Sequence, residues 1–378
     1  MISIKNIEPS IVLPGAEGRI QAAVKWLCRS QDAWQVGGSA AYYAPLFGWA
    51  RPYPETSGYI APTLWRCADV FSSPELAARA LRMVRWLVDI QSEEGWFPAG
   101  RWRSNETGIP SVFNTAQVLF GLLEAWKRTG DSTFDKAARK SASWLASVQD
   151  ADGRWRKHAY VPEYSPSYYS HACWPLAECG VVFSDDRLKD AAARGIEAIL
   201  RDQQKDGTFE CWSFSPGKAA FTHTIGYTFC GILETSVILD LGFARKCVEE
   251  SCWKLLRKFE IQNRLAGSYG KGWDGDFGFV CLTGNCQIGL AWLHLYILSG
   301  DPRYLQGALK AVGLVCRKQV KRSVFPNLNG AIAGSSPIYG KYMAFRYPNW
   351  AAKFFIDVIL GLAAALHRIG IKVGGGWE

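Results

Sequence analysis

A repeat of nearly constant length constrains the fold more than any other feature of the chain. Six helical segments end close to a glutamine, at Gln31, Gln91, Gln149, Gln203, Gln262 and Gln319. Successive glutamines lie 60, 58, 54, 59 and 57 residues apart. Self-similarity at a fixed period is the sequence mark of a repeat architecture. We therefore expect six copies of one structural unit.

The second copy, "QSEEGWFPAGRW", shows most clearly how one unit ends. A glutamine closes an apolar helical run, and an acidic turn with glycine and then tryptophans follow it. We expect the glutamine to bond backbone groups at the helix end and the glycine to make the turn. The tryptophans are expected to cover the opening of the fold, either as structural staples only or also as stacking surfaces for a ligand.

Two kinds of helix alternate along the chain. Amphipathic helices are expected at 20–30, 76–90, 134–148, 187–201, 244–261 and 304–319, with apolar residues at helical spacing and charges between them. Between them lie six segments that are apolar nearly all round, and a helix without a polar face must be buried. This alternation predicts an all-α fold, an (α/α)6 toroid formed by residues 1–378 as a single domain.

Loop length predicts which end of the toroid is functional. Links from a buried helix to the next amphipathic one are short, as in "TGDS" and "SGDPR", whereas links in the other direction are long. Because the connections alternate, all the long loops gather where the buried helices begin. Long loops are commonly functional, and helix N-termini favour negative charge. We therefore expect the site at this end.

Composition narrows the classes of protein. The net charge is +9, and Lys and Arg are scattered along the chain. This pattern indicates either a surface with dispersed charges or a positive field that attracts an anionic ligand. It contains no basic run long enough to be a nucleic-acid tail. The apolar run near the C-terminus carries Lys353 and Asp357, which favours a buried helix over a membrane span. The chain lacks a leader-like start, and its eleven cysteines lack paired spacing. We expect reduced thiols, a cytoplasmic location, no metal and no cofactor.

The Gln–Gly–Trp units resemble the repeats of the terpenoid cyclase and protein prenyltransferase superfamily, whose fold is an α/α toroid. No DxDD motif for protonating an alkene occurs, and no Asp/Cys/His zinc set matches. The stretches "YPETSGYIAPT", "FNTAQVLFGLL", "THTIGYTFCGILE", "CLTGNCQIGLAWLHLY" and "YPNWAAKFFIDVILGL" are more similar to toroid proteins of bacterial exopolysaccharide and capsule clusters. That resemblance implies a carbohydrate substrate. Glycoside hydrolases, polysaccharide lyases and C5-epimerases also use the α/α toroid.

Candidate site residues follow from the expected starts of the buried helices and the loops before them. For catalysis we single out Glu55, Glu106, His171, His223, Tyr227 and Asp274. For substrate binding we single out Tyr53, Trp96, Arg101, Trp102, Asn114, Tyr168, Trp273, Asp276, Asn285, Arg346, Asn349 and Trp350. Tyr168 and His171 share one helix face, as do His223 and Tyr227, because residues three or four apart are neighbours.

Each candidate also has a structural interpretation. Glu55 and Glu106 fit as acids that interact with a helix dipole, and His223 fits as a hydrogen-bonded core histidine. The acids of "WDGDF" fit an Asx turn, and Asn285 fits as a link between helices. His294, deep in its helix, is assigned to packing.

Two mechanisms suit this inventory. In a uronate polymer, an amide or Arg neutralises the carboxylate, and Tyr or His removes the C5 proton, giving a lyase or an epimerase. Hydrolysis instead needs two facing carboxylates.

Our first hypothesis is an enzyme of exopolysaccharide biosynthesis that acts on an acidic glycan and contacts the synthesis machinery. A glycoside hydrolase, a terpene cyclase or prenyltransferase relative, and a non-catalytic glycan-binding scaffold remain open alternatives.

Overall fold

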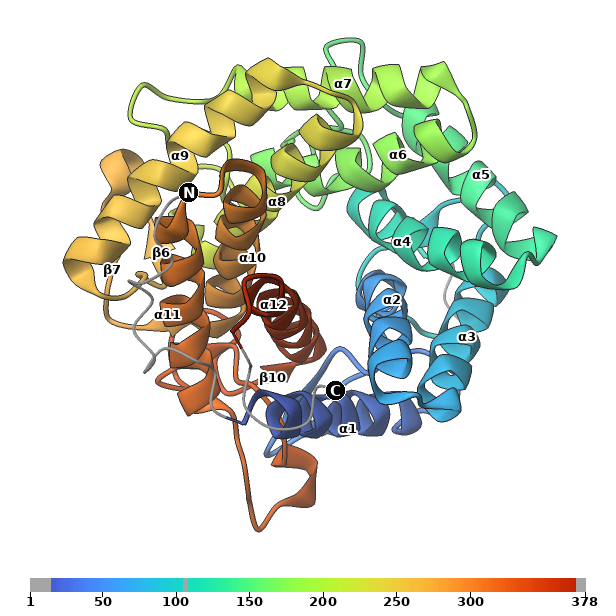
Figure 1. Ribbon diagram of the computed structural model, residues 1–378. Helices are drawn as coiled ribbons and strands as arrows, with labels where there is room; N and C mark the ends of the chain where they lie inside the picture. Colours follow the sequence, from blue (N-terminus) through green and yellow to red (C-terminus); the bar gives the residue numbers. More distant parts are fainter. Residues whose placement is uncertain (1–14, 105–107, 372–378) are drawn as a thin grey trace.

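The computed structural model describes residues 15–104 and 108–371. Helices in this part alternate between two concentric rings (Figure 1). The outer ring contains α1 (Ala16–Asp32), α3 (Pro74–Asp89), α5 (Ser132–Ser147), α7 (Asp186–Leu200), α9 (Gly242–Gln262) and α11 (Pro302–Lys318). The inner ring contains α2 (Pro54–Phe71), α4 (Val112–Thr129), α6 (Ser170–Val182), α8 (Thr222–Ile238), α10 (Leu282–Ser299) and α12 (Asn349–Arg368). The predicted (α/α)6 toroid is confirmed.

The two rings differ because their helices bury different fractions of their surface. The outer helix α3 buries one apolar stripe and exposes its charged face, whereas the inner helix α4 is buried along most of its length. Short links join each inner helix to the next outer one, and in four of the five links of the described residues a side chain caps the outer helix. Ser73, Asp131, Asp185 and Asp301 each accept a hydrogen bond from a first-turn backbone N–H group.

Helix α12 is long and apolar enough to cross a membrane, alone among helices in the described ranges. It is nevertheless one of the six inner helices, and most of it is buried within the ring. A buried ion pair of Lys353 with Asp357, 2.8 Å, lies in its middle. The prediction of a buried helix is confirmed.

Short strands, which the sequence pattern does not predict, connect the long loops. Strand β1 (Tyr42–Ala44) pairs antiparallel with both β2 (Gly48–Trp49) and β10 (Tyr347–Pro348). β3 (Phe97–Pro98) pairs with β4 (Pro110–Ser111). β6 (Ser268–Tyr269) pairs with both β5 (Ala220–Phe221) and β7 (Gly275–Asp276). β8 (Val280–Cys281) pairs with β9 (Ser335–Ser336). Two- and three-residue strands have no periodicity for a sequence pattern to show.

The repeat glutamines join neighbouring outer helices. Gln149 Nε2 donates to the carbonyl oxygens of Gly153, 3.0 Å, in its own turn and Ala191, 2.8 Å, in α7. Gln31, Gln91, Gln203 and Gln319 likewise reach the outer helix of the next unit. Gln262, in contrast, is exposed at the end of α9. The expected backbone-bonding role is therefore confirmed for five of the six copies.

The repeat glycines make the turn and touch the next outer helix. Gly153 has a φ of 90°, and an added Cβ would lie 2.4 Å from the carbonyl oxygen of Arg194. Gly37, Gly95, Gly207 and Gly330 also have positive φ. Only glycine combines this backbone conformation with so close an approach.

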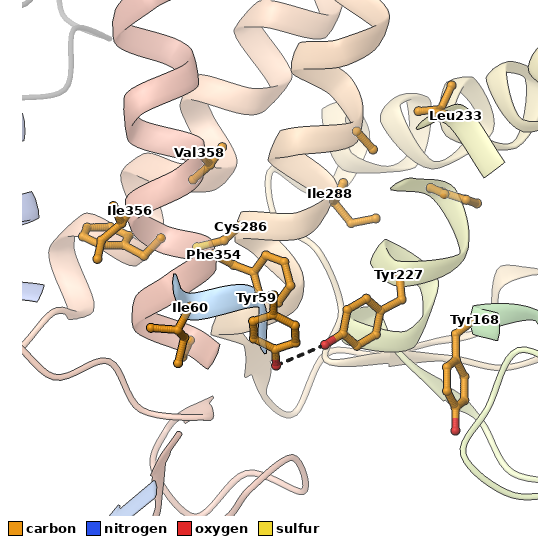
Figure 2. Close-up of a cluster of buried hydrophobic side chains, with 14 of the residues drawn as sticks. Tyr59, Ile60, Tyr168, Tyr227, Leu233, Cys286, Ile288, Phe354, Ile356 and Val358 are labelled. Carbon is orange, nitrogen blue, oxygen red and sulfur yellow. Dashed lines mark hydrogen bonds between the residues drawn. The ribbon is translucent and has the colours of Figure 1, made fainter. Parts of the chain in front are cut away.

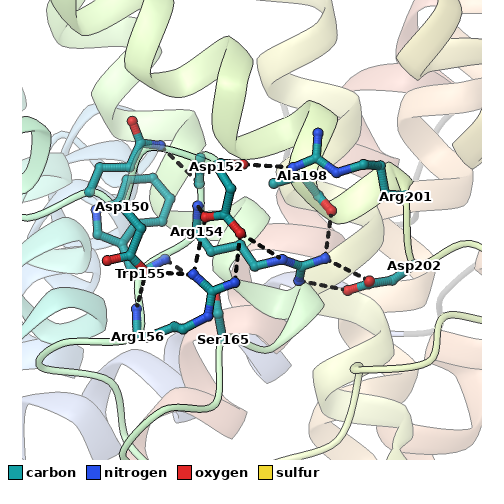
Figure 3. A network of polar contacts seen from close by, with 11 residues as sticks. Asp150, Asp152, Arg154, Trp155, Arg156, Ser165, Ala198, Arg201 and Asp202 are labelled. Carbon is teal, nitrogen blue, oxygen red and sulfur yellow. Dashed lines mark hydrogen bonds and ion pairs between the residues drawn. The ribbon is translucent and has the colours of Figure 1, made fainter.

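Charged side chains reinforce the third turn (Figure 3). Arg154 donates to both carboxylate oxygens of Asp202, at 2.9 and 2.7 Å, and so ties the turn to the end of α7. The tryptophan of this copy, Trp155, is 1% exposed and donates to the carbonyl oxygen of Leu145, 2.9 Å. The expected covering role of the repeat tryptophan is wrong here, because the ring packs under its own outer helix.

Candidate functional site

Aromatic side chains fill the centre of the ring near the starts of the inner helices (Figure 2). We call Tyr59, Phe113, Tyr168, Tyr227 and Phe354 the aromatic layer. The Tyr227 hydroxyl donates to the Tyr59 hydroxyl across the ring, 3.4 Å. Phe113 contacts Tyr168 and Tyr227 edge to face, at centroid distances of 5.2 and 5.3 Å. The layer divides the interior into a side facing the long loops and a side facing the short links.

A central cavity of about 490 Å³ lies on the short-link side of this layer. All its lining residues belong to inner helices, mostly to their middle and last turns, and none belongs to a long loop. No long loop lines this cavity, so the expected site at the long-loop end is separate from it and stays a prediction. Large aromatic side chains such as Tyr59 and Phe354, in the second turns of α2 and α12, form the cavity wall on the side of the long loops.

His171 is the predicted catalytic residue that lines the cavity. Gln117 donates its amide N–H to the His171 carbonyl oxygen, 3.1 Å, and thereby turns its amide oxygen toward His171 Nδ1, 2.8 Å. An amide oxygen only accepts, so Nδ1 carries the proton and Nε2 keeps its lone pair. Burial holds the pKa of His171 well below its usual value, aided by the charge of Lys353. The imidazole is a neutral base with a fixed tautomer.

Two cations share one carboxylate in the cavity wall. Asp357 accepts from Lys353 Nζ, 2.8 Å, and from Arg66 Nη2, 2.6 Å, and Thr63 donates to it at 2.7 Å. Burial opposes ionisation of Asp357, but the two cations lower its pKa. Burial lowers the pKa of Lys353. Asp357 is thus shared by Lys353 and Arg66, and Glu124 also acts on Arg66 from the same cavity wall.

Three glutamates near the ends of the inner helices complete the polar lining. Glu124 pairs with Arg128 at 2.6 Å, and Glu178 pairs with Lys127 at 2.5 Å. Glu234 pairs with His294 at 3.0 Å. Burial opposes protonation of His294, but Glu234 raises its pKa overall. The assignment of His294 to packing is wrong, since its ring lines the cavity.

His223 has the same type of partner as His171 but lies on the long-loop side. Its Nδ1 lies 2.7 Å from the amide oxygen of Gln287, and burial lowers its pKa to about 3. Its ring contacts Tyr227 and Tyr342, with centroids 4.5 and 5.0 Å apart. Tyr227 also contacts His171, at 4.6 Å, so one tyrosine separates the two histidines.

Glu55 is buried in the first turn of α2, beside Tyr53. Burial raises the pKa of this carboxyl to about 7, although a hydrogen bond with Tyr53 opposes the rise. Tyr53 contacts Trp350 edge to face at 6.3 Å, and Trp350 Nε1 donates to the Tyr342 hydroxyl, 2.8 Å. These predicted residues form a second polar site on the outer side of the aromatic layer.

Other predicted binding residues have structural partners. Asn114 donates to the Pro98 carbonyl oxygen, 2.7 Å, and Asn285 to that of Cys281, 2.8 Å. Asn349 joins α12 to the first long loop through Ser39 and Ala40 and to α2 through Thr56. Buried Trp273 donates to the Asp206 carbonyl oxygen, 2.9 Å, and Asp276 pairs with Lys341, 2.6 Å.

The remaining predicted residues lie away from the cavity. Arg101, Asp274 and Arg346 are exposed, and Trp96 and Trp102 are half-buried in the second long loop. Glu106 lies outside the described residues.

Sequence reasoning missed most of the polar cavity wall. Arg66, Glu124, Glu234 and His294 each stand twelve residues after the first residue of their helix, and Glu178 and Asp357 stand eight residues after theirs. Each of the six largely apolar inner helices thus carries a polar residue eight or twelve positions after its first residue, and this recurrence is visible in the sequence. Loop length instead favours the opposite end of the helices, where the long loops gather.

Comparison with known proteins agrees with this architecture. Residues 54–230 match the squalene-hopene cyclase C-terminal domain. The squalene–hopene cyclase of Bradyrhizobium diazoefficiens is 29% identical over 165 residues, covering 42% of this chain and 23% of that protein. The ent-copalyl diphosphate synthase of a Streptomyces species is 30% identical over 112 residues, covering 30% and 20%. The chain thus matches about a quarter or less of these relatives' length, and the expected likeness to the terpenoid cyclase superfamily is confirmed.

Solved structures of similar shape cover nearly the whole chain. An unsaturated glucuronyl hydrolase specific for heparin has a TM-score of 0.74 at 15% identity, covering 94% of this chain and 99% of that one. Cellobiose 2-epimerase from Bacillus thermoamylovorans has a TM-score of 0.73 at 11% identity, covering 90% and 98%. An α-mannanase from Bacteroides thetaiotaomicron has a TM-score of 0.67 at 10% identity, covering 96% and 100%. These likenesses show the α/α-toroid fold.

Proposed function

We propose that the chain is a carbohydrate-active enzyme that removes a proton from an acidic, uronate-containing glycan in the central cavity. The observation that carries this proposal is a neutral, oriented His171 in a cavity wall that also holds Arg66 and Lys353. The reaction is of the lyase or C5-epimerase type.

The chemistry follows from the charges. Arg66 and Lys353 neutralise much of the negative charge of a uronate carboxylate placed beside them. The carboxylate then repels a developing carbanion less, so the C5 proton of the sugar becomes more acidic. His171 Nε2 takes that proton as general base. The carbanion then either expels the C4 oxygen substituent, forming a C4–C5 double bond, or regains a proton at C5. The first outcome is elimination and the second is epimerisation.

Trp174 supplies a surface for the sugar ring. It is half-buried in the cavity wall and contacts His171 edge to face, with ring centroids 5.2 Å apart. Aromatic faces pack on apolar surfaces such as the C–H face of a pyranose. A sugar stacked on Trp174 would therefore lie next to the base. The names of the structural neighbours, a glucuronyl hydrolase and a sugar epimerase among them, support a carbohydrate substrate.

The first test replaces His171 with Asn, which keeps a hydrogen-bonding side chain but removes the base. Purified protein is incubated with a panel of uronate polymers in deuterated water. Wild-type protein should either raise ultraviolet absorbance by elimination or incorporate deuterium at C5. His171→Asn should lower that rate about 10²–10⁴-fold, the usual contribution of a general base.

His158→Asn is the matched control, because His158 lies outside the cavity beside Trp144. It should keep the wild-type rate. Undiminished turnover in His171→Asn, or no proton exchange by wild-type protein on any polymer, would refute the proposal.

An isoprenoid cyclase is a second candidate, favoured by the match of residues 54–230 to a cyclase domain. Tyr59, Phe120, Trp174 and Phe354 line the cavity with aromatic faces that attract cations. Conversion of a linear polyprenyl substrate to a cyclic product, lost in Trp174→Ala, would favour this candidate over the first.

A glycoside hydrolase has less support. Glu124, Glu178 and Glu234 each pair with a basic side chain in the cavity wall, whereas hydrolysis needs one protonated carboxyl. Glu55, with its raised pKa, lies on the other side of the aromatic layer. Release of a reducing end without a new double bond would indicate hydrolysis.

A further inference from the structure

A groove outside the central cavity combines arginines with aromatic rings. It lies at the long-loop end, where the β1–β2 hairpin meets the loop that follows α3, and its volume is about 450 Å³. Arg51, Arg101, Trp34, Tyr42, Phe47 and Trp49 are among its lining residues. We propose that this groove binds a chain of acidic sugars through their carboxylates, separately from the central cavity.

The arginines of the groove lie close to aromatic rings. The Arg51 guanidinium lies over Trp34, 5.5 Å from the ring centroid. Arg101 lies over Tyr42, at 5.7 Å, and donates from Nη1 to its hydroxyl, 3.2 Å. A stacked guanidinium keeps its N–H donors in its own plane, so its edge can still donate to a carboxylate. Stacking also lowers the entropy cost of fixing these long side chains around a ligand.

Arg51 and Arg101 bring positive charge to the groove. None of the groove's described lining residues is acidic. Within residues 15–104 and 108–371, neither Arg51 nor Arg101 forms an ion pair. The contrast is Arg303, which lies over Trp253 at 4.2 Å but also pairs with Asp301 at 2.5 Å. Arg346 adds a further cation over the other side of the hairpin, 5.2 Å from Tyr42.

Three loops hold the groove in shape. β1 pairs with β2 and β10, so the first and last long loops form one small sheet beneath the arginines. The backbone N–H of Trp102 donates to the Pro52 carbonyl oxygen, 2.8 Å, which attaches the second long loop to the first. Trp34 Nε1 donates to the Ala50 carbonyl oxygen, 2.7 Å. A site built on paired strands keeps its donors in place before a ligand arrives.

The aromatic walls select a sugar chain over a simple anion. Phe47 is 89% exposed, and Trp34 and Trp49 are partly exposed beside it. Pyranose rings stack on such faces while their carboxylates reach the arginines. An anionic membrane surface is the other partner that exposed apolar residues and arginines would suit. We favour the glycan because the arginines line a concavity and are fixed by rings.

This inference rests on the proposed function for the class of glycan, but it concerns binding and not turnover. The test therefore uses full-length protein with His171→Asn, which retains the groove. A galacturonate hexamer and neutral cellohexaose are titrated by calorimetry at low and moderate salt. The acidic hexamer should bind, and its affinity should fall as salt rises, because exposed charges are screened. The neutral hexamer should bind at least about tenfold more weakly, since it lacks the charge-assisted bonds.

The deciding variant is Arg51→Ala with Arg101→Ala in the same background. It should weaken binding of the acidic hexamer about tenfold or more, because each charge-assisted bond contributes on that order. Arg257→Ala is the matched control, since Arg257 also lies over a tryptophan, Trp253 at 5.8 Å, and should leave binding unchanged. Arg51→Lys with Arg101→Lys keeps the charge without the planar fork and should give an intermediate affinity. Thermal melts confirm that the variants are folded.

Three results would overturn the inference. They are equal binding of both hexamers, acidic binding that survives the double alanine variant, or binding to anionic phospholipid vesicles without binding to the hexamer. If wild-type protein binds the hexamer through the groove but turns over no glycan, the proposed reaction fails while the groove assignment stands.

Discussion

At the residue scale, burial shifts the pKa values of basic and acidic side chains in opposite directions. His171 and His223 each face a glutamine amide oxygen, and burial lowers the pKa of both. Only His171 lines the cavity, so only its free nitrogen can meet a ligand there. Glu55 shows the opposite shift, because burial penalises the charged form of a carboxyl and raises its pKa.

Glu55 should make stability depend on pH. Its pKa rises from 4.5 in the unfolded chain to about 7 in the folded protein. Below pH 4.5 it is protonated in both states, and above 7 it is charged in both, so the folded state loses stability as pH rises between these values. The full loss is about 3 kcal/mol at 1.36 kcal/mol per pKa unit.

Glu55→Gln removes this titration. The free energy of unfolding of the variant, relative to that of the wild type, should therefore be higher at about pH 8 than at about pH 4.5, by up to about 3 kcal/mol. Urea denaturation of wild type and variant across this range measures the difference. Glu93→Gln, at an exposed position, is the control. A pH-independent difference for Glu55→Gln would show that the carboxyl titrates alike in both states.

At the element scale, each outer helix is attached to the next by a glutamine and a glycine. The glutamine bonds a carbonyl group of the next outer helix, and the glycine allows the turn to touch that helix. The joint from α9 to α11 is the exception. Gln262 is exposed, and its loop instead forms the β6–β7 hairpin.

The exception supplies a matched pair of variants. Gln149→Ala removes three hydrogen bonds and should lower the free energy of unfolding by about 1–3 kcal/mol, since the partly buried turn loses its attachment to α7. Gln262→Ala should change it by less than about 0.5 kcal/mol. Chemical denaturation measures both. Equal effects at the two positions would contradict the joining role.

At the scale of the whole molecule, closure of the ring sets stability. The last unit contacts the first through Gln319, whose amide donates to the Arg19 carbonyl oxygen at 3.0 Å, and through the β1–β10 pair. Gly330 has a φ of 85°, and an added Cβ would lie 2.0 Å from the Ala22 carbonyl oxygen in α1. Substitution there must separate the first and last units.

Gly330→Ala should cost about 2–4 kcal/mol, combining backbone strain with overpacking. Gly130→Ala has similar strain, at φ 68°, but open space around the added Cβ, and should cost about 1–2 kcal/mol. Thermal unfolding gives the comparison. Hydrogen exchange should speed up in both α1 and α11 for Gly330→Ala. Faster exchange confined to the loop would contradict a role in closure.

The sequence by itself determined the number of units, the alternation of helices and the clustering of the long loops at one end. Helical periodicity and the spacing of glutamines are local properties, and local patterns suffice to define elements and their order. The same reasoning predicts His171 as a site residue, because it stands beside Tyr168 at the start of a buried helix, and the structure places it in the cavity wall.

Tertiary structure alone decided where the cavity lies. Whether the side chains at one level of a ring leave space or fill it depends on six helices at once, and no single helix shows it. Here the Tyr227 hydroxyl donates to the Tyr59 hydroxyl across the ring (Figure 2), and Tyr168 packs beside Tyr227 with ring centroids 6.5 Å apart. Glu124, Glu178 and Glu234 converge on the other end, although 54 and 56 residues separate them along the chain. Packing of large side chains around a common axis is a non-local property, so the site could be located only once the ring was closed.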